Sequence, residues 1–183
     1  MSQTLSPLSK CCSDGFERSN PKIVLLEYLY LDLQTCERCV GTEQVLDEVV
    51  TTLRPALQLG GYEVDYRKIK METLELAKQY QFRSSPTIRV NGRDICLAVQ
   101  ENSCDCCSDI SGTDVDCRIF EYNGKNYEVP PKEMLAEAIL QAVFSFREKK
   151  CCPDSEYVLP VNLETFYQGK SEKSGCDCGS NCC

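Results

Sequence analysis

Thiol chemistry is the most prominent capability of this chain, since it holds fifteen cysteines and no histidine in 183 residues. Cys36 and Cys39 form a C-x-x-C motif between an apolar segment and an amphipathic one. At a helix N-terminus, free N–H groups and the helix dipole lower the pKa of a thiol. The resulting thiolate attacks disulfides or binds soft metals. We therefore expect Cys36 to be an exposed thiolate and Cys39 its partner, or both to be half of a zinc site.

A second group of cysteines lies in the middle of the chain, downstream of Cys96. Its four members are Cys104, Cys106, Cys107 and Cys117. Four thiolates suit a tetrahedral zinc site or an iron–sulfur cluster. Adjacent cysteines bond to each other only with strain, but they can share a large, soft ion. Two interpretations stay open: a zinc or disulfide staple for a loop poor in apolar residues, and a site for ion transfer or sensing.

The remaining cysteines lie near the ends of the chain: Cys11, Cys12, Cys151, Cys152, Cys176, Cys178, Cys182 and Cys183. Glycine, serine and asparagine make the last segment flexible, as suits a capture arm. The alternative is a disordered end with incidental cysteines. Abundant thiolate without histidine favours soft ions such as Cu(I), Zn(II), As(III), Hg(II) or Cd(II). A trivalent arsenic ion needs three thiolates in a pyramid, which a flexible cluster can supply.

Composition narrows the function further. The formal net charge is −8 and no basic patch stands out, so we expect no nucleic-acid partner. No apolar stretch approaches the roughly 20 residues of a membrane span, and residues 1–22 lack the apolar core of a secretory signal. We therefore expect a cytoplasmic protein. Without histidine, no Ser-His-Asp or Cys-His arrangement can form. No phosphate-binding loop appears, and we expect no organic cofactor.

Periodicity predicts a mixed α/β domain. Residues 1–21 read as a flexible cysteine-bearing arm, 22–150 as the domain with a cysteine-rich insertion over 96–117, and 151–183 as a flexible cysteine-rich tail. The predicted strands cover residues 23–33, 62–69, 87–90 and 93–97, followed by a hairpin over 118–129. Three helices are predicted: one that starts after Thr35, one over residues 71–80, and one that starts at Pro130-Pro131. Pro55 should kink or end the first helix, and Gly60-Gly61 should terminate it.

The predicted order is therefore β-α-β-α-β-β, an insertion, and a last helix. That is the order of a thioredoxin core, so the expected fold class is α/β and thioredoxin-like. In thioredoxin-like proteins a cis proline lies beside the dithiol and shapes the substrate groove, which assigns that role to Pro86.

Several segments resemble one prokaryotic family. They are Leu31–Cys39, Arg89–Ile95, Cys104–Cys107 with Asp116–Arg118, and the hairpin Glu121–Tyr127. Together they resemble the thioredoxin-like, cysteine-rich family known as domain-of-unknown-function family 2703, over about residues 21–150. The resemblance implies a thioredoxin-like fold and no settled activity. The pairs Cys11-Cys12 and Cys151-Cys152 are also similar to cysteine pairs of arsenic metallochaperones.

Three hypotheses follow. The first is a protein that handles soft metal or metalloid ions (arsenic, mercury or zinc), with the terminal cysteines delivering or scavenging the ion. The second is a dithiol–disulfide oxidoreductase in which Cys36 attacks and Cys39 resolves, acting on a thiol-bearing partner or substrate. The third is a structural zinc protein.

Overall fold

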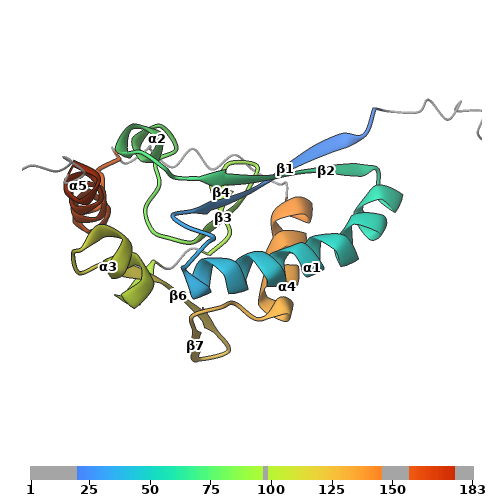
Figure 1. Cartoon of the computed structure of the whole chain (residues 1–183). Coiled ribbons are helices and arrows are strands. Elements are labelled where there is room, and N and C mark those ends of the chain that lie inside the picture. Colours follow the sequence, from blue (N-terminus) through green and yellow to red (C-terminus); the bar gives the residue numbers. More distant parts are fainter. Residues whose placement is uncertain (1–19, 97–98, 146–156, 176–183) are drawn as a thin grey trace, which may run out of the picture.

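The computed structural model describes residues 20–96, 99–145 and 157–175. These residues form a mixed α/β structure with two β-sheets and five α-helices (Figure 1). Figure 1 shows α1 (Glu37–Leu59) and α4 (Lys132–Phe144) on one side of the larger sheet and α2 (Leu74–Gln79) on the other, while α3 (Asp105–Ser111) and α5 (Val161–Gly175) lie side by side at one end.

A parallel pair of strands starts the larger sheet. β1 (Lys22–Tyr30) is joined through α1 (Glu37–Leu59) to β2 (Tyr62–Lys70), and the two strands pair in parallel along their full length. The predicted strand–helix–strand order is confirmed here. β1 is rich in β-branched and apolar residues because it lies between two layers of helices and is buried on both faces.

The sequence predicts that Pro55 either kinks or ends the first helix, and the structure shows that α1 does not end there. The helix continues to Leu59, and Gly60 caps it. The Pro55 ring is exposed, so it meets no packed neighbour, whereas Leu57 in the next turn is buried against the sheet. Burial of Leu57 therefore holds the last turn in place despite the lost backbone hydrogen bond.

The second half of the sheet is antiparallel. α2 (Leu74–Gln79) leads to β3 (Thr87–Val90), which returns as β4 (Arg93–Asp94). The strand order is β2-β1-β3-β4, and β3 runs antiparallel to β1. The predicted turn at Asn91-Gly92 is confirmed, since both residues have positive φ, as a tight hairpin turn requires. β4 is shorter than the predicted 93–97, of which residue 97 lies outside the described ranges.

The insertion predicted over 96–117 carries secondary structure of its own. β5 (Gln100–Ser103) leads into α3 (Asp105–Ser111), followed by β6 (Asp116–Tyr122) and β7 (Lys125–Tyr127). These strands form the second sheet in the order β5-β6-β7, entirely antiparallel. The predicted hairpin around Asn123-Gly124 is confirmed, with β6 starting two residues earlier than expected. The predicted insertion is therefore folded, and it shares a sheet with the hairpin that follows it.

α4 (Lys132–Phe144) starts after Pro131, as predicted, and packs on α1 and β3. It buries Leu135, Ile139 and Val143 in a core shared with α1 and the larger sheet. This core fixes the position of α1, and so of the C-x-x-C motif at the start of that helix.

The last helix corrects the prediction of a flexible tail over 151–183. α5 (Val161–Gly175) buries Leu163, Phe166 and Tyr167 against the rest of the protein. The spacing i, i+3, i+4 puts these three side chains on one helical face, and that face is the reason the segment docks. The low overall hydropathy of the segment concealed this short apolar stripe.

Among the helices of the described ranges, each is too short or too polar to cross a bilayer.

Candidate thiol cluster

Four buried cysteines from distant parts of the chain converge at one place. The Sγ atoms of Cys36, Cys104 and Cys107 all lie within 4.8 Å of one another. The Cys107 and Cys36 sulfurs are 3.9 Å apart, and the Cys117 and Cys107 sulfurs are 3.3 Å apart. All four side chains are buried. We call these four residues the thiol cluster.

Three elements fix the four members of the cluster. Cys36 is the N-cap of α1, and Cys104 is the residue that precedes α3. Cys107 lies one turn further along α3, and Cys117 lies on β6. The Cys104 N–H donates to the Val115 carbonyl at 2.9 Å, which closes the loop between α3 and β6. Three separate elements must therefore be in place before the sulfurs can meet.

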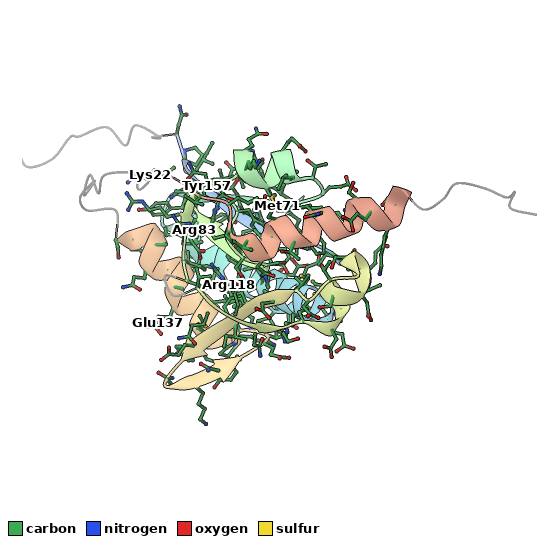
Figure 2. The ribbon with its side chains drawn as sticks, turned by 90° about the vertical axis from the view of Figure 1, so that its left-hand side faces the viewer. Lys22, Met71, Arg83, Arg118, Glu137 and Tyr157 are labelled. Atoms are coloured by element: carbon green, nitrogen blue, oxygen red, sulfur yellow. The ribbon has the colours of Figure 1, made fainter. Side chains whose placement is uncertain are left out.

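An apolar shell seals the thiol cluster from water. The shell is contributed by β1, α2, the residues around them and α5, and includes Leu29, Leu31, Met71, Ala77, Phe82, Val115, Leu163, Phe166 and Tyr167. Figure 2 shows α5 passing close to Met71, and the Tyr167 hydroxyl donates to the Met71 carbonyl at 2.7 Å. An ion at this cluster would therefore be bound away from solvent, where exchange is slow.

Hydrogen bonds among the thiols decide which sulfur is charged. Bonds from Cys104, Cys107 and Cys117 hold the pKa of Cys36 far below its usual value. Hydrogen bonding to Cys104 raises the pKa of Cys107, and bonds to Cys104 and Cys107 raise that of Cys117. Hydrogen bonds from Cys107 and Cys117 also lower the pKa of Cys104, to about 7. A thiol that donates to a thiolate keeps its own proton, so the cluster favours a thiolate at Cys36, with Cys104 the next thiol to ionise and Cys107 and Cys117 protonated.

The loop before Cys36 is held by Asp32. One Asp32 carboxylate oxygen accepts from the Gln34 N–H at 2.9 Å and from the Thr35 N–H at 2.6 Å. Burial alone would raise the pKa of Asp32, but these hydrogen bonds, with that from the Thr35 hydroxyl, lower it overall. The ionised carboxylate therefore orders the turn that delivers Cys36 to the start of α1.

Cys39 lies beside the cluster and in a different environment. Its Sγ is 3.4 Å from the Ser85 hydroxyl, and its carbonyl accepts from the Tyr28 hydroxyl at 2.6 Å. Hydrogen bonding to Cys36 and burial raise its pKa. The Ser85–Pro86 peptide bond is cis, so Pro86 has the isomer expected from the sequence and lies next to a residue that contacts Cys39.

The structure revises two expectations about these cysteines. Cys36 is 0% exposed, so it is not the exposed thiolate predicted from its place in the sequence, because the insertion and α5 cover it. The sequence also suggested two separate centres, whereas Cys36 joins Cys104 and Cys107 in one.

The remaining predicted ligands divide into two sets. Cys106 is only half-buried and lies outside the group of three close sulfurs, because its side chain leaves α3 on a different face from Cys107. The other predicted ligands lie outside the described residues: Cys11, Cys12, Cys151, Cys152, Cys176, Cys178, Cys182 and Cys183.

Sequence reasoning missed two arginines that frame the site. Arg38, between the two cysteines of the motif, is buried and contacts β5 and β6. Arg118 follows Cys117, is 0% exposed and forms a two-pronged ion pair with Asp94 at 3.0 and 2.7 Å. The signal available in the sequence was their adjacency to cysteines, which does not reveal their partners.

The fold and site thus define a mixed α/β protein with a buried cysteine cluster that could hold a metal ion. Residues 24–139 match the family described as Domain of unknown function (DUF2703), and the chain belongs to that family. The match includes the whole thiol cluster, whereas α5 lies beyond it. No significant match to the chain is found among curated proteins or among solved structures.

Proposed function

We propose that this protein binds a soft metal or metalloid ion, of the arsenic, mercury or zinc type, at its thiol cluster. The observation that carries the proposal is the convergence of the Cys36, Cys104 and Cys107 sulfurs within 4.8 Å of one another. Thiolates are the ligands that soft ions prefer. Three sulfurs at this spacing offer one face to an ion, and Cys117, 3.3 Å from Cys107, offers a fourth ligand.

The number of ligands separates the candidate ions. Zinc takes four ligands in a tetrahedron, with Zn–S bonds of about 2.3 Å, so it would recruit Cys117 as well. A trivalent metalloid needs only three sulfurs and would leave Cys117 free. A fully enclosed site is typical of structural zinc, so zinc would support the fold in addition to being bound.

The architecture around the site supports a thioredoxin-like fold as part of this proposal. Along the chain the elements follow the predicted order β-α-β-α-β-β, and in the larger sheet β1 and β2 are parallel while β3 is antiparallel. The C-x-x-C motif at the start of α1 and the cis Ser85–Pro86 bond agree with that reading. An experimental structure with a different strand order would count against it.

Native mass spectrometry of the anaerobically reduced full chain, with and without arsenite or zinc, tests the function. We expect the wild type to bind at least one ion that is lost when Cys36, Cys104 and Cys107 are replaced together by serine. The matched control replaces Cys96 and Cys106, which lie outside the three close sulfurs, and should retain that ion. Equal stoichiometry in the cluster variant and the control would refute the assignment.

The role of the last segment in delivery remains a separate part of the proposal. Residues 176–183 carry four thiols in the sequence. Deleting them should lower the total ion stoichiometry while the ion at the thiol cluster stays bound and the circular dichroism spectrum stays unchanged. Unchanged total stoichiometry in the truncated protein would remove the delivery role and leave the cluster site standing.

A second candidate function, thiol–disulfide exchange by Cys36 and Cys39, is favoured by one observation. The pKa of Cys36 is lowered by hydrogen bonds from Cys104, Cys107 and Cys117, while the hydrogen bond with Cys36, and then burial, raise the pKa of Cys39. Such a split gives one nucleophile and one protonated resolving thiol. The Cys36 thiolate would attack a substrate disulfide, and Cys39 would then displace the bound sulfur, forming the Cys36–Cys39 disulfide and releasing both substrate thiols.

Burial opposes this second function, because both sulfurs are 0% exposed and a substrate must reach Cys36. Turnover with a small disulfide, abolished in Cys36→Ser, would support it. A Cys36→Ser variant with full turnover would rule it out, and so would a wild type that never gains the Cys36–Cys39 bond.

A further inference from the structure

Arg38 makes the densest set of polar contacts around the thiol cluster. It sits inside the C-x-x-C motif and is 9% exposed. Its Nη2 donates to the Ser103 carbonyl at 2.6 Å and to the Glu128 carboxylate at 2.7 Å. Its Nη1 donates to the side-chain oxygen of Asn102 at 2.5 Å and makes longer contacts of 3.4 Å with the Asn102 and Cys117 carbonyls.

These partners belong to the segments that carry the other sulfurs. Ser103 immediately precedes Cys104, and the Cys117 carbonyl belongs to a member of the cluster. Asn102 lies opposite Cys117 in the pairing of β5 with β6. One guanidinium on α1 therefore contacts β5, which leads into Cys104 and α3, and β6, which carries Cys117.

We propose that Arg38 is a positioning residue of the thiol cluster, fastening β5 and β6 to α1 so that Cys36 meets Cys104 and Cys107. This inference rests on the proposed function for its effect on ion binding. Its effect on the packing of the thiols holds without any ion.

The planar guanidinium suits this task better than an ammonium. It presents several N–H donors in a fixed fork, so it can reach Asn102, Ser103 and Glu128 at once. A lysine keeps the charge but offers a single point of attachment. Charge alone would also stabilise nearby thiolates, so the comparison of arginine with lysine separates geometry from electrostatics.

The contacts across the interface between α1 and the insertion make the loss of Arg38 costly. The Ser103 carbonyl and the Asn102 side-chain oxygen would lose this donor at a partly buried interface, and the buried Cys117 carbonyl would lose its longer contact. Buried acceptors without a donor are destabilising. The expected result is that β5 and β6 separate from α1 and the sulfurs move apart.

The test uses the reduced full chain and two readouts. The first is the rate at which N-ethylmaleimide labels Cys36 and Cys104 in metal-free protein, measured by peptide mass spectrometry. The second is the affinity for arsenite and for zinc. Arg38→Met should raise labelling at least ten-fold and weaken ion binding by a similar factor, and Arg38→Lys should recover only a small part of either.

Arg54→Met is the matched control. Arg54 lies on the same helix and also donates to a backbone carbonyl, that of Val64 at 2.9 Å, but it lies outside the cluster. Its replacement should leave labelling of Cys36 and ion affinity within two-fold of wild type. Folding of each variant is checked by far-ultraviolet circular dichroism.

Should Arg38→Met fail to fold, the milder variants Asn102→Ala and Glu128→Ala decide the question, since each removes one side-chain acceptor of Arg38. Each should raise labelling several-fold. Wild-type labelling in a folded Arg38→Met, or in both milder variants, overturns the inference. If Arg38→Lys is protected from labelling as fully as the wild type, the inference is also overturned, because the positive charge alone would then explain the effect. If the wild type binds neither ion, the proposed function fails, and the labelling readout still decides the role of Arg38.

Discussion

Replacing Gly169 by alanine tests whether α5 is docked tightly on α3. Gly169 is buried where the two helices approach. An added Cβ would lie 2.6 Å from the Ser111 carbonyl oxygen and 2.7 Å from the Thr113 methyl carbon. The Ser111 contact is with backbone, so it can be relieved only by moving α5 away from α3.

Two opposing terms set the size of the effect. Overpacking of this kind costs about 1–3 kcal/mol. Alanine gains about 1 kcal/mol over glycine inside a helix, whatever its surroundings. Because the contact with backbone cannot be relieved by a side-chain rotation, we take the upper part of the range for the cost. The free energy of unfolding should therefore fall by about 1–2 kcal/mol.

Urea unfolding followed by circular dichroism measures the change. The control is Gln168→Ala, at the exposed neighbouring position, which should stay within about 0.5 kcal/mol of wild type. Gly169→Ala should also raise maleimide labelling of the thiol cluster, since α5 forms part of its apolar shell. A Gly169→Ala protein about 1 kcal/mol more stable than wild type would show that helix propensity acts alone, and would refute the docking of α5.

Two further predictions concern the surroundings of the site. Asp94→Asn should lower the free energy of unfolding by about 3 kcal/mol in the same urea assay, because it leaves the fully buried Arg118 guanidinium without its counter-charge. This value is at the low end of the cost for breaking a buried ion pair, since the Asp94 side chain is 26% exposed. A loss below about 1 kcal/mol would contradict the buried pair. Cys96 should react with iodoacetamide at pH 8 far more slowly than Cys106, because burial, and then Asp94, raise its pKa to about 12. Equal rates of the two thiols in native protein would contradict this, whereas equal rates in urea are expected.

Much of the fold could be predicted from local patterns. The apolar run of β1, the amphipathic α1 and α4, and the turns at Asn91-Gly92 and Asn123-Gly124 all follow from short-range preferences. The secondary structure of the insertion and of α5 could not be predicted from local patterns. α3 is short and cysteine-rich, and α5 has only a narrow apolar stripe, so neither gives a strong periodic signal.

The membership of the thiol cluster was less predictable than the fold. The sequence placed Cys104, Cys106, Cys107 and Cys117 together because they are close along the chain. The helical phase of α3 instead turns Cys107 and Ser111 inward and leaves Cys106 half-buried. Recognition of α3 as a helix would have been enough to tell the two adjacent cysteines apart, since neighbours on a helix point about 100° apart.

The sequence by itself determined which side chains are available for chemistry and most of the secondary structure, because residue type and periodicity are local properties. Fifteen cysteines without histidine are the basis on which we predict soft-ion or disulfide chemistry. The tertiary structure alone decided that Cys36 meets Cys104 and Cys107, that Arg38 joins their segments, and that α5 covers them. Those relations span more than forty residues along the chain, and they arise only when the hydrophobic burial of α1, the insertion and α5 brings these elements into contact.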